Sequence, residues 1–180
     1  MLNIFLQNAS AQKYLIDTNC FITPSRFYYA FDIVPSYWAE LLRAGTAGRV
    51  VLLDMVKSEL FQKGDELSKW LQGNQDSFIT CMHNTNEIIA QYTQVVNYIR
   101  NSADYSGRAL KKWSKSSVAD PWLIAAAKVN NYVITTFETP FKNQVKGQQQ
   151  DNPKVPDVAK VFGVETSDLY DTMRQLGIRI

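Results

Sequence analysis

The chain has 180 residues, of which 46% are hydrophobic and 20% are charged, and we expect a single domain over residues 1–180. Its 19 basic and 17 acidic residues leave a net charge of +2, which is too small to indicate a nucleic-acid-binding protein by itself. No apolar run approaches the roughly 18 residues that cross a membrane, and the first residues lack the basic start of a secretory signal. We therefore expect a cytoplasmic protein that has no membrane partner.

The cysteine and histidine content narrows the possible chemistry. Cys20 and Cys81 are the only cysteines, and their wide separation argues against a zinc site or a disulfide framework, so we expect both in the core. His83 is the single histidine, and no arginine stands five residues before it. Nuclease mechanisms that need a histidine pair or an RxxxxH motif are therefore not expected. His83 itself is expected at the surface or partly packed.

In the first half of the chain, strand patterns alternate with helix patterns. Residues 13–16 are a short β-prone run that ends in the polar turn 17–19, as a buried strand does at an exposed edge. Residues 36–44 alternate apolar and polar faces at helical spacing. The β run 49–53 follows, and Asp54 directly after it can cap a helix that runs to about residue 63.

The second half continues this alternation. The apolar residues of 88–99 recur at the spacing of one helical face. Residues 121–129 indicate a buried, alanine-rich helix, and the β-branched run 132–136 indicates the next strand. Two more helices are expected over 156–162 and 167–176. Together these elements predict an α/β domain with a mainly parallel sheet flanked by helices.

Two polar segments lie outside this pattern. Residues 142–153 are rich in Gln, Asn and Lys without apolar spacing, which predicts a mobile loop. Residues 100–115 carry five cations against one acid, with Tyr105 and Trp113 between them. This stretch is either a solvated face or a surface that follows a single-stranded phosphate backbone. The candidate nucleic-acid-binding residues in it are Arg108, Lys111, Lys112 and Lys115.

Four acids recur at matching places in the predicted topology. Asp17 ends the first strand, Glu59 lies on the helix after the second, Asp120 stands at a helix start, and Glu138 follows the strand ending at residue 136. Sites in open α/β sheets form beyond the carboxyl ends of the strands. Carboxylates without histidine or thiolate suit Mg²⁺ or Mn²⁺, and through them phosphate substrates, so the pattern predicts phosphodiester hydrolysis.

Each acid also has a structural interpretation. Asp17 can simply cap a turn after its strand, and Glu59 can be an ordinary residue of a solvated helix face. Asp120 precedes Pro121, and this pair is a ready N-cap followed by a first-turn proline. Capping and metal binding can coexist at Asp120, so these alternatives stay open.

Four segments carry a resemblance to a known superfamily. They are LIDTN at 15–19, the KSEL segment around Glu59, ADPWLIAAA at 119–127 and VITTFE at 133–138. In this order and spacing they resemble the motifs of PIN-domain nucleases, which implies a three-layer α/β/α fold. The opening YLIDTNCFI, the WAELL helix, GDELSKW at 64–70 and the ending KVPDVAKVFGV to GIRI further resemble an uncharacterised bacterial PIN-like family. Members of that family have been suspected of being VapC-like toxins.

The resemblance also implies roles for individual residues. Asp17, Glu59 and Asp120 would bind Mg²⁺ or Mn²⁺ directly or through water. Glu138 stands where many members have Asp, and it would reach a second metal or a bridging water, or else leave only one metal well bound. Supporting roles fall to Thr18, Asn19, Thr135 and Thr136. The first two would orient Asp17, and either of the others would contact metal-bound water or a substrate phosphate.

Three functions are compatible with this sequence. The first is a metal-dependent endoribonuclease, and the resemblance adds a toxin role with a co-encoded antitoxin that covers the acidic pocket and a possible homodimer. The second is a PIN-like module that binds RNA or protein without cutting. The third, a phosphatase of the haloacid dehalogenase type, would need an aspartate where Asn19 stands. DNA remains open as a substrate.

Overall fold

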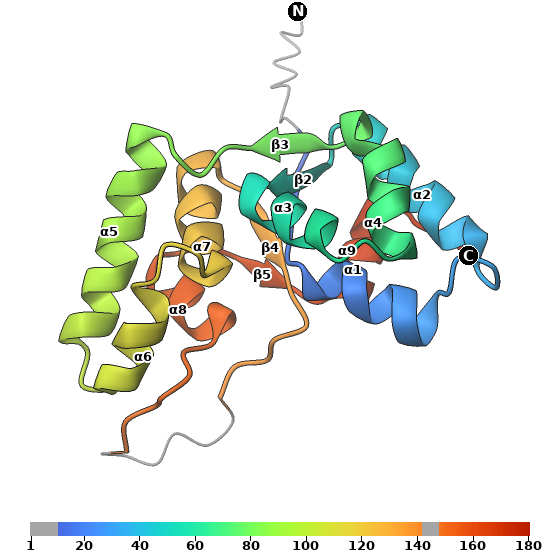
Figure 1. The fold of residues 1–180 in the computed structure, drawn as a ribbon. Coiled ribbons are helices and arrows are strands. Elements are labelled where there is room, and N and C mark those ends of the chain that lie inside the picture. Colours follow the sequence, from blue (N-terminus) through green and yellow to red (C-terminus); the bar gives the residue numbers. More distant parts are fainter. Residues whose placement is uncertain (1–10, 142–147) are drawn as a thin grey trace, which may run out of the picture.

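The computed structural model describes residues 11–141 and 148–180, and its centre is a five-stranded sheet (Figure 1). The strands are β1 (Tyr14–Ile16), β2 (Val50–Leu53), β3 (Ile79–Cys81), β4 (Val133–Thr135) and β5 (Thr166–Ser167). Their order is β3-β2-β1-β4-β5, and every neighbouring pair is parallel. In the register of the central strand, Leu15 lies opposite Val51 on one side and Ile134 on the other. The predicted α/β class is confirmed, and within the described residues the sheet is wholly parallel.

Helices cover both faces of this sheet, so the domain has three layers. Helices α5 to α8 gather on one side, and α1, α2, α4 and α9 lie on the other (Figure 1). The helices are α1 (Asn19–Thr23), α2 (Pro35–Thr46), α3 (Asp54–Gln62), α4 (Glu66–Gly73), α5 (Asn86–Asn101), α6 (Gly107–Trp113), α7 (Ala119–Asn130), α8 (Val155–Val161) and α9 (Leu169–Leu176). A π-helical turn, η1 (Pro24–Tyr28), extends α1, and a 3-10 turn, η2 (Gln75–Ser77), precedes β3. None of the described helices is both long and apolar enough to cross a membrane.

Burial explains which strands the sequence pattern finds. Every residue of β1, β2 and β4 is buried, as expected for parallel strands covered on both faces, and these three were predicted. The two edge strands were not predicted. In β3, Ile79 is half-buried and Thr80 is exposed, while β5 has only two residues and neither is buried. Short edge strands therefore lack the apolar run that marks the central ones.

The two cysteines and the predicted loop can now be placed. Cys20 and Cys81 are buried free thiols, so their expected place in the core is confirmed. Part of the segment 142–153 lies outside the described residues. Its described end is tied to the chain before α6, because the Gln150 N–H donates to Asp104 O at 2.7 Å and Gln150 O accepts from Ser106 N–H at 3.0 Å.

Gly45 in α2 provides a test of the core packing. A Cβ at this position would lie 2.7 Å from ring carbons of Phe78 and 2.9 Å from Ser77 O. The Phe78 ring is itself held edge-on against Phe21. We expect Gly45→Ala to lower the free energy of unfolding by about 1–3 kcal/mol, measured by urea unfolding followed by circular dichroism.

The matched control for this variant is Gly73→Ala. Gly73 is also helical, but a Cβ there would meet nothing within 4 Å. Its substitution is expected to be neutral or to stabilise by up to about 1 kcal/mol, because alanine favours a helix. Equal stabilities of the two variants would contradict the packing described for Gly45.

Candidate acidic site

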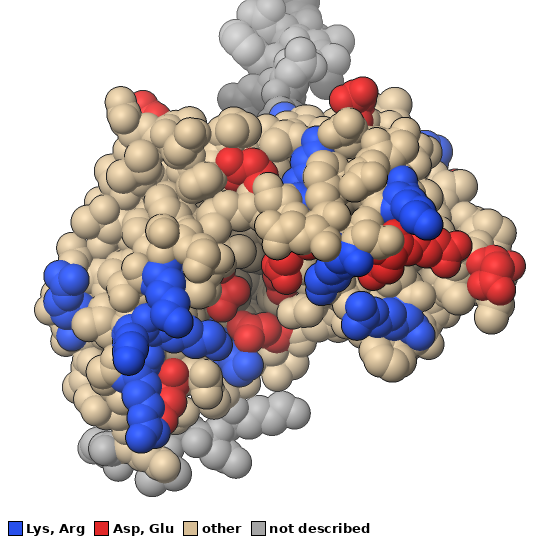
Figure 2. All heavy atoms as spheres, in the orientation of Figure 1, with Lys and Arg blue, Asp and Glu red and all other residues tan. Residues whose placement is uncertain are grey.

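The four predicted acids meet at the carboxyl-terminal edge of the sheet. Asp17 follows β1, which lies between β2 and β4, so Glu59 on α3 and Glu138 after β4 flank it along the sheet. Asp120 enters from the first turn of α7. Acidic side chains gather in and around a hollow at the centre of the face shown in Figure 2. The topology thus brings the four carboxylates into one region, as their positions after the strands predicted.

Asp17 is the most enclosed of these acids, with 7% of its surface exposed. Its backbone N–H donates to Thr135 O at 2.9 Å, which continues the β1–β4 pairing. The Thr136 hydroxyl donates to Asp17 Oδ2 at 3.0 Å. Burial, followed by the charges of Asp120 and Glu138, raises the pKa of Asp17 to about 6, although hydrogen bonds from Thr136 and the Thr18 backbone oppose the shift.

Asp120 is half-buried, and its place in the helix corrects one interpretation of the sequence. Val118 is the N-cap residue of α7, and Asp120 lies in the first turn without a capping hydrogen bond. Burial first, and then the charge of Glu138, raises the pKa of Asp120 to about 6. Lys112 and Lys154 lower it, and Glu59 adds to the increase. A helix N-terminus favours an anion, so the raised pKa shows how strongly the other groups oppose this charge.

Glu59 is exposed, and a hydrogen bond joins it to Thr18, which follows β1. The Thr18 hydroxyl donates to Glu59 Oε2 at 2.9 Å. Thr18 was expected to orient Asp17, but its side chain binds Glu59, and only its backbone N–H acts on Asp17. Asn19 is exposed, and its side chain makes no hydrogen bond to any described residue, so the expected orienting role is not seen.

Glu138 accepts two hydrogen bonds that the sequence did not indicate. Lys154 Nζ donates to its Oε1 at 2.9 Å, and the Val155 N–H donates to its Oε2 at 2.7 Å. Val155 is the first residue of α8, so Glu138 binds the start of that helix, where an anion is favoured. Both carboxylate oxygens are therefore engaged by donors within this structure.

The hydroxyls of the two candidate threonines, Thr135 in β4 and Thr136 directly after it, have different partners. Thr136 binds Asp17, and its hydroxyl also accepts the Glu138 N–H at 3.1 Å, so it links two of the acids. The Thr135 hydroxyl instead pairs with that of Thr172 on α9 at 2.9 Å, and both side chains are buried. Of the two alternatives, Thr136 is therefore the threonine that lies at the acids, and contact with water or phosphate stays a prediction for its hydroxyl.

The donor set bears on the predicted metal. Across residues 11–141 and 148–180, no group of three or more His, Cys, Asp or Glu is arranged to hold a metal ion. Both Glu138 oxygens are engaged by Lys154 and Val155, and Glu59 is exposed, so Asp17 and Asp120 are the enclosed acids that still have oxygens available to an ion. Two carboxylates suit Mg²⁺, which keeps several waters and binds substrate phosphates in addition to a few protein ligands. These two acids fit such an ion, and Glu138 as it is placed does not.

Two cavities of different character flank the acids. One, of about 540 Å³, is lined by Lys112, Glu138 and Lys154 together with residues 148–153. The other, of about 340 Å³, is lined by Glu59, Asp54, His83 and Ala119 among others, and its lining contains no Lys or Arg. The side of the site next to β4 therefore has two lysines, Lys112 and Lys154, beside the acids Glu138 and Asp151, whereas the side next to β2 has acids and no Lys or Arg.

In the basic stretch 100–115, the structure separates the aromatic residues from the cations. Trp113 is fully buried and Tyr105 is 6% exposed, so neither ring is available to stack on a base, and the two aromatics give no support to the phosphate-following alternative. Arg108 pairs with Asp151 at 3.0 Å. Lys111, Lys112 and Lys115 are exposed. Basic side chains cover the α6 region beside the hollow (Figure 2), so phosphate attraction remains a prediction for the cations alone.

The sequence did not indicate that Lys154 and His83 lie near the acids, although His83 is partly packed as expected. Lys154 precedes α8, and only the fold brings it to Glu138. His83 Nδ1 lies 2.7 Å from Asp54 Oδ2, and its backbone N–H donates to Asp54 Oδ1 at 3.2 Å. The signal for this pair lies in the topology, because Asp54 follows β2 and His83 follows the neighbouring strand β3.

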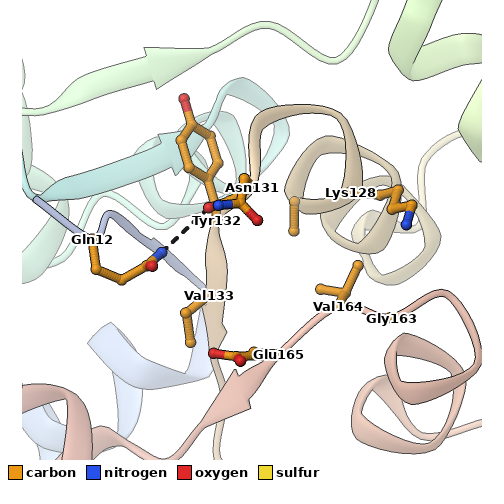
Figure 3. A pocket seen from close by; sticks show the side chains of 9 residues that line it. Gln12, Lys128, Asn131, Tyr132, Val133, Gly163, Val164 and Glu165 are labelled. Carbon is orange, nitrogen blue, oxygen red and sulfur yellow. Dashed lines mark hydrogen bonds between the residues drawn. The ribbon is translucent and has the colours of Figure 1, made fainter. Parts of the chain in front are cut away.

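A further pocket lies at the opposite edge of the sheet. It has a volume of about 210 Å³ and is lined by residues that precede β1, β4 and β5, among them Gln12, Asn131 and Glu165 (Figure 3). Gln12 Nε2 donates to Asn131 O at 3.3 Å across it. Sites in parallel sheets form at the carboxyl ends of the strands, so we assign this pocket no role in the chemistry of the acids.

Fold and site together define an α/β protein with an acidic centre at the carboxyl-terminal edge of a parallel sheet. The chain belongs to the family described as Domain of unknown function (DUF4411), whose model matches residues 14–180. No curated protein matches the chain. The matched region includes all four acids of the site.

Proposed function

We propose that this protein is a metal-dependent endoribonuclease that uses Mg²⁺ or Mn²⁺ at Asp17 and Asp120. The observation that carries the proposal is the pair of enclosed carboxylates whose pKa values are raised to about 6 by burial and by the charges around them. A divalent cation would stabilise the ionised form of both carboxylates, because it neutralises negative charge that burial and the neighbouring acids oppose. The resemblance of the surrounding motifs to PIN-domain nucleases supports the same assignment.

The residues of the chain would divide the work of phosphodiester hydrolysis. A divalent ion bound at carboxylates supplies an activated water and stabilises the charge of the leaving oxygen. Thr136 holds Asp17 in place through its hydroxyl. Lys112 and Lys154 line the cavity beside Glu138, where they would attract the phosphates of a single strand. The products we propose carry 5′-phosphate and 3′-hydroxyl ends.

The biological setting belongs to the same proposal. We propose a cytoplasmic toxin that a co-encoded antitoxin neutralises by covering the acidic hollow, with a homodimer as the expected assembly. These points rest on the resemblance to VapC-like toxins, and the acidic hollow offers a surface that a basic segment of an antitoxin would fit.

A second candidate, a non-catalytic module that binds RNA or protein, is favoured by one observation. Both carboxylate oxygens of Glu138 accept hydrogen bonds, one from Lys154 and one from the first residue of α8, so Glu138 has a structural role in this structure. Metal binding distinguishes the two candidates.

The test of the proposed function is calorimetric titration of the metal-free protein with Mn²⁺. We expect binding by the wild type and its loss in Asp17→Asn and Asp120→Asn, because each variant removes an anionic ligand. Glu165→Gln is the matched control, since Glu165 is an exposed acid at the opposite edge of the sheet. Absence of binding by folded wild type, with or without single-stranded RNA, would favour the non-catalytic module.

A further inference from the structure

The cavity beside Glu59 contains a histidine whose orientation is fixed. Asp54 receives two donors from His83, the ring Nδ1 at 2.7 Å and the backbone N–H at 3.2 Å. The His83 ring also lies edge-on to Trp122, with centroids 5.0 Å apart, and Trp122 is stacked on Tyr92. Carboxylate and aromatic contacts therefore hold the imidazole from two directions.

This arrangement determines what the other ring nitrogen can do. An ionised carboxylate only accepts hydrogen bonds, so Nδ1 carries the proton that faces Asp54. In neutral His83, Nε2 is then an acceptor with a free lone pair. No hydrogen bond to Nε2 occurs within residues 11–141 and 148–180, and about a third of the side chain is exposed. The histidine thus offers a fixed acceptor at the cavity that it lines.

The lining of this cavity indicates the chemistry of its occupant. Its titratable residues are Asp54, Glu59 and His83, and it has no Lys or Arg, so a phosphate would find no cation there. Ser58, Gln62 and Ser117 supply neutral polar groups, and Met55 and Ala119 supply apolar contact. A neutral group that donates hydrogen bonds and carries an apolar face fits this lining better than an anion does.

We infer that the 340 Å³ cavity is a nucleoside subsite of the proposed nuclease, in which His83 Nε2 accepts a hydrogen bond from a ribose 2′-hydroxyl. The inference rests on the proposed function for the identity of the substrate and gives it a basis for choosing RNA over DNA, since only RNA carries the 2′-hydroxyl. The phosphates next to the bound nucleoside would lie toward Lys112 and Lys154, across the acids. Asp54 acts as a positioning residue that fixes the tautomer of His83.

Binding measured without metal tests this inference apart from cleavage. The probes are a fluorescent pool of random-sequence RNA hexamers and the corresponding DNA pool, in EDTA, with affinity measured by anisotropy. We expect His83→Ala to lower the affinity for the RNA pool about three- to tenfold, toward that for DNA, as loss of one hydrogen bond predicts. Lys112→Ala is the contrasting variant, and it should weaken RNA and DNA binding by similar factors, because phosphate contacts do not distinguish the two.

A tautomer test protects the result against a simple packing defect. In Asp54→Asn the side-chain carbonyl or amide can still meet Nδ1, but the amide no longer requires the proton there, so the share of the Nδ1–H tautomer should fall while the fold is kept. His83 is the only histidine of the chain, so its ring nitrogens give one unambiguous set of signals in long-range ¹H–¹⁵N spectra. At pH 8 we expect the wild type to show the Nδ1–H tautomer and to shift its Nε2 signal with the RNA pool but not with the DNA pool.

The outcomes separate this inference from the proposed function. An Nε2 shift that is equal for RNA and DNA, or absent with RNA that is shown by anisotropy to be bound, overturns the subsite even if the protein cleaves RNA. A shift specific to RNA without metal binding supports the subsite and overturns the nuclease. A mixture of the four free ribonucleosides as a third probe shows whether the cavity takes a nucleoside without its phosphates.

Discussion

Asp17→Asn is expected to lower metal-dependent cleavage of single-stranded RNA about a thousandfold, because the amide cannot supply the charge that holds a divalent ion. Asp17 is the best-placed acid for this role, since it is buried and held by Thr136 and by the β1–β4 pairing. Asparagine keeps the shape of the side chain and an oxygen that can accept from Thr136, so the substitution should leave the fold intact. The measurement is the initial rate on labelled RNA with Mn²⁺, compared with the same reaction in EDTA.

Glu138→Gln is the informative comparison for this variant. Its carboxylate already binds Lys154 and the Val155 N–H, so we expect cleavage to fall by no more than about tenfold, chiefly through a looser start of α8. Glu165→Gln should retain the wild-type rate. Equal losses for Asp17→Asn and Glu138→Gln would mean that Glu138 leaves its present partners and takes part at the metal, contrary to the geometry described.

Asp17→Asn is also expected to stabilise the metal-free protein near neutral pH. The pKa of Asp17 is about 6 in the folded protein against an ordinary value of 3.8, which corresponds to a cost of up to about 3 kcal/mol when the group is ionised. Part of this cost is shared with Asp120, because each charge opposes the other. We therefore expect Asp17→Asn to raise the free energy of unfolding by about 1–2 kcal/mol at pH 7.5.

The sign of the pH dependence follows from the raised pKa. The folded protein holds a proton on Asp17 that the unfolded chain releases at lower pH, so the stability from this group is complete below 3.8 and is lost as the pH rises through 6. The advantage of Asp17→Asn should accordingly disappear near pH 4. Asp65 and Asp151, whose pKa values are lowered by hydrogen bonds, act in the opposite direction in both proteins. Urea unfolding of both proteins in EDTA gives the difference, and a constant difference between pH 4 and pH 7.5 would contradict the raised pKa of Asp17.

The parts of the fold that could be predicted are those where local sequence and burial agree. Each of β1, β2 and β4 is apolar or β-branched because helices cover both its faces, and the helix α5 carries a long stripe on one face. The strand β5 could not be predicted, because Thr166 and Ser167 are held by pairing with β4 and not by burial of their own side chains. Long-range pairing leaves no local pattern in so short a segment.

The candidate site also has parts that the sequence could predict and parts that it could not. The positions of Asp17 and Asp120 follow from the strand and helix that carry them, so the sequence places both acids at the correct edge. The engagement of Glu138 depends on Lys154, 16 residues later, and is visible only once α8 is placed. Trp113 was open to a surface role because α6 is too short for its apolar face to be distinguished, whereas the fold buries it completely.

The central place of β1 also affects how the protein is made. Its neighbour β4 is synthesised more than a hundred residues after it, and the pairing joins Tyr14 to Val133 and Leu15 to Ile134. Asp17 is anchored by Thr135 and Thr136 at the end of that later strand. A nascent chain on the ribosome is therefore expected to lack an organised acidic centre until β4 and the threonines at its end have emerged. A growing polypeptide surrounded by messenger and ribosomal RNA is thus kept from assembling the centre before β4 is available to pair with β1.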